Sequence, residues 1–168
     1  MRNVIIGALL IAAVSTLGDF VWAGLHLRHR VIYGLAHGAI LFACIGAYIG
    51  SLKHTVIRGA MSGAAIGLAA AGSFYVLAPI AGYSVMFVVW AFIWLALAFL
   101  VGNTPVLLRG VLAMLGSGLG FYLISDIWRP FDPQGWDYAV HYISWAVAYL
   151  PAFAALLLKL KAPLARTA

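Results

Sequence analysis

The chain has 168 residues, of which 65% are hydrophobic and only 8% are charged, and its mean hydropathy is +1.06. Soluble globular domains carry about 25% charged residues, so this composition excludes an ordinary soluble protein and predicts an integral membrane protein. The net charge of +6 is accompanied by no basic stripe interleaved with aromatic residues, and this excludes a nucleic-acid partner.

Six apolar segments follow one another along the chain. A helix needs about 20 apolar residues, each rising about 1.5 Å, to cross about 30 Å of hydrocarbon. The expected spans are 4–25, 31–50, 57–78, 82–101, 106–128 and 137–158. Because the connections between them are short, we predict an all-α polytopic transmembrane helical bundle that forms one integral membrane domain over residues 1–168.

The charged residues are distributed unequally between the two ends of these segments. The end that holds both termini carries most of the basic residues: Arg2, Lys53, Arg58, Arg109, Lys159, Lys161 and Arg166. The other end carries Arg28, Arg30, Arg129 and the acidic residues Asp19, Asp126, Asp132 and Asp137. Basic residues accumulate in cytoplasmic connections. The pattern therefore predicts a bacterial-type inner (plasma) membrane protein with both termini in the cytoplasm.

A weak internal repeat is visible in the polar residues. An arginine opens each odd-numbered span: Arg2, Arg58 and Arg109. Asp19 and Asp126 follow the first and third of these at the same separation, and a Tyr-to-His step ending at His37 or His141 opens the next span. This spacing favours three tandem helical hairpins with polar groups in the outer two. Arginine at a span edge is also expected from topology alone, so the duplication is a hypothesis.

Glycine recurs in the third segment at every fourth residue, at Gly59, Gly63 and Gly67. A stripe of small residues lets two helices approach closely. We therefore expect tight packing here and place the third segment at the centre of the bundle. Such faces serve contacts within one chain and between chains alike, so the oligomeric state is left open.

Two aspartates and two histidines form the candidate polar site. Asp19 and His37 flank the first outer connection at similar depth, and Asp126 and His141 flank the third. An ionised aspartate inside a membrane costs about 2.5–3.5 kcal/mol at the bilayer centre and so needs a partner. We expect an Asp–His pair within each outer hairpin, and the convergence of all four residues into one outward-facing site.

A cationic cluster lies in the first outer connection, at Arg28, His29 and Arg30, and Arg129 lies in the third. Guanidinium groups bind carboxylates and phosphates through paired hydrogen bonds. These residues are expected to attract an anion or a lipid headgroup at the entrance of the site. The alternative is a salt-bridged clasp with the acidic residues of the 128–137 connection.

Three functions fit this arrangement. Imidazole changes charge near neutral pH, so the first is binding or transport of a small solute or a proton. The second is a metal-dependent membrane hydrolase, in which Asp19, His37, Asp126 and His141 hold a divalent metal. No short-range metal motif such as HExxH supports it, and the sequence indicates no other cofactor. The third is a non-catalytic structural or lipid-binding scaffold, whose partners are membrane lipids.

Overall fold

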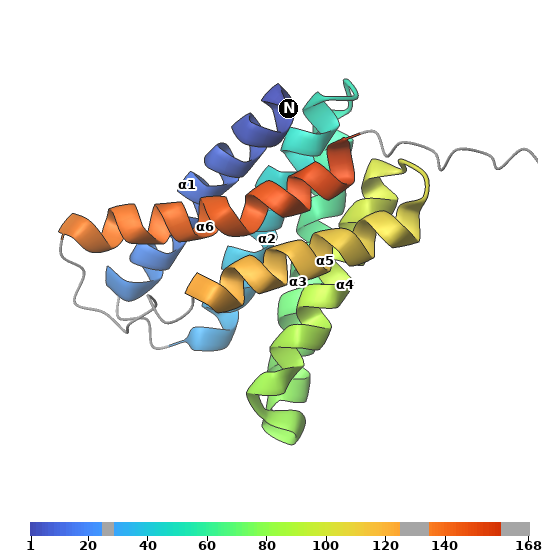
Figure 1. Cartoon of the computed structure of the whole chain (residues 1–168). Helices are drawn as coiled ribbons and strands as arrows, with labels where there is room; N and C mark the ends of the chain where they lie inside the picture. The colour runs from blue at the N-terminus through green and yellow to red at the C-terminus, as the bar shows by residue number, and fades with distance from the viewer. Residues whose placement is uncertain (25–28, 125–134, 159–168) are drawn as a thin grey trace, which may run out of the picture.

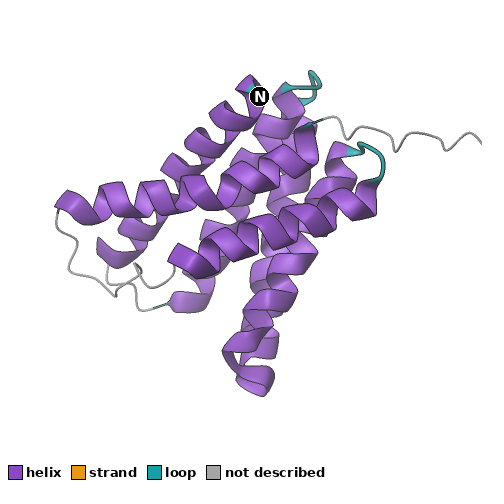
Figure 2. Ribbon diagram, viewed as in Figure 1, coloured by secondary structure: helices purple, strands orange, loops and turns teal. Residues whose placement is uncertain are grey.

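A computed structural model describes residues 1–24, 29–124 and 135–158. Its helices are α1 (Arg2–Gly24), α2 (Arg30–Ser51), α3 (Val56–Ala81), α4 (Val85–Val101), α5 (Val106–Ile124) and α6 (Gly135–Leu157), with the short 3₁₀ turn η1 (Gly82–Ser84) between α3 and α4. All regular structure in the described residues is helical (Figure 2). The all-α prediction is confirmed, and the helices coincide with the six predicted segments to within a few residues at each end.

Several of these helices have the length and hydropathy of membrane spans. Within the described residues, four stretches qualify: Arg2–Val21, Val31–Ser51, Val56–Ala81 and Tyr138–Leu157. Two further apolar helical stretches, in α4 and α5, are shorter: Val85–Val101 and Val106–Gly118. The fold is therefore a helical bundle with four candidate membrane-spanning helices, and this indicates a multi-pass membrane protein.

The helix ends alternate between the two ends of the bundle. In Figure 1 the N-terminus, the α2–α3 connection, the α4–α5 connection and the end of α6 lie in the upper part of the view. The α3–α4 connection lies at the bottom. Consecutive helices that cross a membrane produce this alternation, and the end holding the N-terminus is the basic end of the chain.

Close packing joins α2 to α3 through glycines on both helices. A Cβ placed on Gly46 of α2 would lie 2.1 Å from the carbonyl oxygen of Gly59, and one on Gly63 of α3 would lie 2.0 Å from the carbonyl oxygen of Phe42. These contacts are with backbone atoms, which move little without shifting a whole helix. The close helix approach predicted from the glycine stripe is confirmed, and the partner of that stripe is α2.

The expected central place of α3 is wrong. Its buried residues are Gly59, Gly63, Gly67 and Ala70, and only 11% of its apolar stretch is buried, against 50% for α6. The helix that contacts α1, α4 and α5 together is α6. Glycines bring two backbones together but supply no side chains to fill a core, so α3 lies at the edge of the bundle.

Large side chains of α4 and α6 fill the core instead. Trp94 and Phe153 are almost completely buried, and the ring of Tyr149 lies 6.3 Å from each of them between centroids. On the outside of the bundle, large apolar residues such as Ile57 and Ile80 are exposed. Such an apolar exterior is what a helix surface needs against lipid acyl chains, because it has no polar group to desolvate.

Arg109 has a structural role that the sequence did not reveal. It is 4% exposed, and its Nη1 donates to the carbonyl oxygens of Ala155, Leu156 and Leu158 at 2.9, 3.2 and 2.7 Å. The last carbonyls of a helix have no partner within the helix. Arg109 therefore closes the end of α6 and balances the partial negative charge there, in addition to its place in the charge distribution.

Candidate functional site

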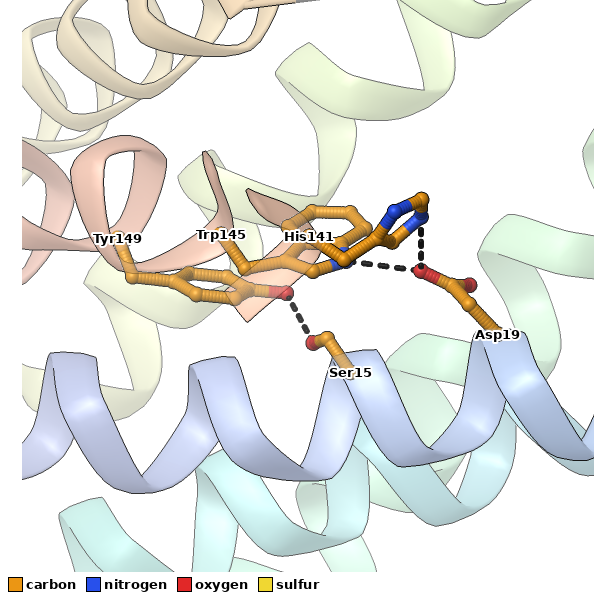
Figure 3. A network of polar contacts seen from close by, with 5 residues as sticks. All are labelled: Ser15, Asp19, His141, Trp145 and Tyr149. Atoms are coloured by element: carbon orange, nitrogen blue, oxygen red, sulfur yellow. Dashed lines mark hydrogen bonds and ion pairs between the residues drawn. The ribbon is translucent and has the colours of Figure 1, made fainter. Parts of the chain in front are cut away.

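The aspartate of α1 faces two side chains of α6. The indole Nε1 of Trp145 donates to Oδ2 of Asp19 at 2.8 Å, and Nε2 of His141 lies 3.7 Å from the same oxygen (Figure 3). His141 and Trp145 are one helical turn apart, so both project from the same face of α6. Among the described residues, the carboxylate thus accepts a hydrogen bond from Trp145 and has the imidazole of His141 within ion-pair distance.

A second polar contact joins the same two helices one turn further along. Oγ of Ser15 and the hydroxyl oxygen of Tyr149 are 2.9 Å apart and share a hydrogen bond. The rings of Trp145 and Tyr149 are stacked, with centroids 5.3 Å apart and planes at 15°. Figure 3 shows the residues of the two contacts in a row between α1 and α6. We call this set of five residues the α1–α6 polar ladder: Ser15, Asp19, His141, Trp145 and Tyr149.

The two members of the titratable pair differ in exposure. The side chain of His141 is 4% exposed and that of Asp19 is 22% exposed, so the carboxylate reaches the protein surface and the imidazole does not. Phe20 packs beside the pair: its ring is stacked on Tyr138 at 3.6 Å and lies 5.4 Å from the ring of His141. At 3.7 Å the carboxylate and the imidazole form an ion pair when the imidazole is protonated, while the indole of Trp145, which does not titrate, holds the carboxylate in position.

His37 lies against the backbone of α1 beside the aspartate. A Cβ on Gly18 would lie only 2.3 Å from Cε1 and 2.7 Å from Nδ1 of this imidazole. The absence of a side chain at Gly18 therefore gives His37 its place between α1 and α2. His37 is half-buried there. Gly18, which it contacts, directly precedes Asp19 in the chain.

The pairing of Asp19 differs from the within-hairpin arrangement that the sequence suggested. Asp19 was expected to pair with His37, and His141 with Asp126. Among the described residues, Asp19 forms its ion pair with His141, across the first and third hairpins; the expected Asp126–His141 pair involves a residue outside the described ranges and stays a prediction. The physical reason is that α1 packs along α6, so the inward face of α1 meets side chains of α6.

The remaining predicted site residues are only partly visible. Asp126, Arg28 and Arg129 lie outside the described residues, and the side chain of Arg30, in the first turn of α2, is not described either. His29 is exposed immediately before α2. The convergence of two aspartates with two histidines, and the cationic entrance, therefore stay predictions.

The metal site also stays a prediction. Within residues 1–24, 29–124 and 135–158, His, Cys, Asp and Glu form no group of three or more that is suited to a metal ion. The predicted ligand set includes Asp126, which lies outside these ranges. The described part of the set supplies the Asp19–His141 pair, with His37 beside it.

Three members of the α1–α6 polar ladder were not assigned a role from the sequence: Ser15, Trp145 and Tyr149. Their signal was present in the spacing. Ser15 and Asp19 are one turn apart on α1, and His141, Trp145 and Tyr149 repeat the same step on α6. Residues four apart lie on the same face of a helix. Two antiparallel helices that each carry polar residues at this spacing can therefore form successive contacts with each other.

Comparison of the chain with protein-family models, curated proteins and solved structures finds no match.

The bond between Trp145 and Asp19 has a measurable effect on stability. Trp145→Phe removes the donor and keeps an aromatic ring, so we expect the free energy of unfolding in detergent to fall by about 1.5–3 kcal/mol beyond the cost of the lost ring volume, because the acceptor is a carboxylate. The control is Trp94→Phe, since Trp94 is also buried and its Nε1 has no hydrogen-bond partner among the described residues. Equal losses in the two variants would contradict this assignment.

Proposed function

We propose that the protein crosses an inner membrane six times with both termini in the cytoplasm, and that its outward-facing Asp19–His141 pair binds or transports a proton or a small solute. Six helices with alternating ends and the accumulation of basic residues at one end support this topology. Helix α4 has 17 residues and spans about 26 Å at about 1.5 Å per residue, which is close to the hydrocarbon thickness. The three-hairpin organisation belongs to the same proposal.

The observation that carries the functional proposal is the position of the pair. Ionisable side chains within membrane spans are costly and mark proton or ion pathways. A carboxylate oxygen lies 3.7 Å from the Nε2 of His141 between two apolar helices. That separation leaves no room for a bulky solute between the two groups, and an imidazole can take up and release a proton near neutral pH. A proton is therefore the favoured ligand, and the partial exposure of Asp19 gives it access.

Beyond the α1–α6 polar ladder, the contact between α1 and α6 is apolar. Toward the end that holds the N-terminus, α1 and α6 continue with apolar residues such as Ile11, Ala152 and Phe153, all completely buried. These three side chains carry no hydroxyl or charged group, so they do not extend the row of polar contacts. In this proposal, proton binding at the pair is the first step, and transport across the membrane requires α1 and α6 to separate.

Proton flux in liposomes tests the proposal. With a pH gradient imposed, vesicles that contain the protein should equilibrate faster than protein-free vesicles, and Asp19→Asn should reduce the rate to that of protein-free vesicles. Asn keeps an acceptor for Trp145 but has no titratable group. Ser15→Ala is the matched control, because it breaks the contact with Tyr149 on the same helix pair and leaves both titratable groups in place. Flux that persists in Asp19→Asn would refute transport through this pair.

A structural role is the second candidate, and a specific observation favours it. Two direct hydrogen bonds, Trp145 to Asp19 and Ser15 to Tyr149, tie α1 to α6 without a mobile proton. If the ladder serves only to hold the bundle together among membrane lipids, Asp19→Asn lowers thermal stability while proton flux stays at background in every form of the protein. Measuring flux and stability on the same preparations separates the two functions.

A further inference from the structure

Two cavities open at the end of the bundle that holds the N-terminus, far from the Asp19–His141 pair. One has a volume of about 390 Å³ and lies between the ends of α1, α2, α4 and α6. The other has a volume of about 350 Å³ and lies between α2, α3 and α4. Lys53, in the α2–α3 connection, lines both. Volumes of this size fall in the range of about 300–1,000 Å³ typical of small-molecule sites.

The polar side chains that line the two cavities are cationic or neutral. In the first cavity they are Arg2, Asn3, Lys53 and Asn103. In the second they are Lys53, Thr55, Arg58 and Ser62. The rest of each lining is mainly apolar, with Leu157 and Leu158 in the first and Phe99 and Leu100 in the second. No carboxylate from the described residues lines either cavity, so both offer positive charge and hydrogen-bond donors beside an apolar wall.

Helix-end carbonyls offset only part of this charge, because one of them bonds to Lys53 and another to the neutral Asn103. Lys53 Nζ donates to the carbonyl of Val101 at the end of α4, and Asn103 Nδ2 donates to the carbonyl of Leu156 at 3.1 Å. An ammonium group has three donor hydrogens, so Lys53 keeps two for a ligand after its bond to Val101.

The exposed arginines at this end have no anionic partner among the described side chains. Within the described part of the chain, Arg2 and Arg58 are exposed and make no ion pair. Asp19 is the one carboxylate whose side chain is described, and it lies toward the other end of α1. The positive charge at the cavities is therefore uncompensated by the described side chains and is available to an external anion.

We propose that these cavities form a site, centred on Lys53 and Arg58, for the phosphate group of an anionic membrane lipid. Basic side chains at the membrane surface each attract anionic lipids by about 1 kcal/mol. The apolar walls formed by Phe99 and Leu100 suit the hydrocarbon that follows a lipid headgroup. The site is independent of proton binding at Asp19 and His141, and it lies on the opposite side of the membrane from the predicted cationic cluster around His29.

Native mass spectrometry of the detergent-purified protein with defined lipids tests the site. Phosphatidylglycerol should be retained in preference to phosphatidylcholine, which has the same phosphodiester but no net charge. Arg58→Gln and Lys53→Gln should each weaken phosphatidylglycerol binding about fivefold, the ratio that corresponds to about 1 kcal/mol. If Lys53→Gln fails to fold because its contact with Val101 is altered, Arg58→Gln alone carries the test.

Arg166→Gln is the charge-matched control, since it removes one positive charge from the segment after α6. It should change phosphatidylglycerol binding less than twofold. Equal retention of the two lipids, or equal weakening in Arg166→Gln and Arg58→Gln, would overturn the proposal. Inorganic phosphate distinguishes the source of the ligand: failure to displace the lipid supports a headgroup site, and displacement supports the phosphate chemistry while assigning the site to a free anion.

Discussion

Replacing Gly63 by alanine should lower the free energy of unfolding by about 1–3 kcal/mol, the usual cost of forcing a methyl group into a closely packed interface. The new Cβ would lie 2.0 Å from the carbonyl oxygen of Phe42 on α2. That atom belongs to the backbone, so relief requires α2 and α3 to move apart along their contact. Chemical denaturation of the detergent-purified variant, followed by circular dichroism, measures the loss.

Gly72→Ala, on the same helix, is the matched control. A Cβ at Gly72 would meet only Leu35 Cδ2, at 3.9 Å, an ordinary contact distance. Alanine is favoured over glycine within a helix by about 1 kcal/mol. We therefore expect Gly72→Ala to leave stability unchanged or raise it slightly. A Gly63→Ala variant as stable as Gly72→Ala would show that α2 and α3 are not in backbone contact.

Loss of the Arg109 guanidinium should be the second large effect. Arg109→Gln removes a buried donor that three carbonyls at the end of α6 share, and we expect the free energy of unfolding to fall by about 1.5–3 kcal/mol. Hydrogen exchange at the amides of the last turn of α6 should accelerate as well, because that turn loses its cap. Denaturation and exchange on the same variant measure both effects.

Arg58→Gln is the comparison for Arg109→Gln. Arg58 lies near the start of α3 as Arg109 lies near the start of α5, but it is exposed. Surface substitutions of this kind usually change stability by no more than about 0.5 kcal/mol. If the two variants lost equal stability, the hydrogen bonds from Arg109 to the end of α6 would not contribute to the free energy of unfolding.

The helices were predictable because composition alone marks them. A segment that must bury every backbone polar group within hydrocarbon has to be helical and apolar along its whole length. That constraint gives the positions of α1 to α6 from hydropathy, with the short connections marked by polar residues and glycine. The glycine step of α3 likewise predicted close packing, because small residues have that effect whatever the partner helix is.

The neighbours of each helix were not predictable in the same way. Hydropathy gives the positions of Asp19 and His141 along their helices but not which helix lies against which. The two residues that bond across the site, Asp19 and Trp145, come from opposite ends of the chain. Sequence proximity therefore favoured His37 as the partner, and the structure gives the contact to α6. The mistaken central place of α3 has the same origin, because a glycine stripe indicates one close contact and not a core position.

A double-mutant cycle on Asp19 and His141 tests the pairing on which the proposed function rests. Asp19→Asn, His141→Gln and the double variant are compared with the parent protein by their free energies of unfolding in detergent. Residues in direct contact show coupling of about 0.5–3 kcal/mol, and we expect a value in this range. Additive effects, with no coupling between the two positions, would mean that the carboxylate and the imidazole do not interact and would contradict the proposed proton site.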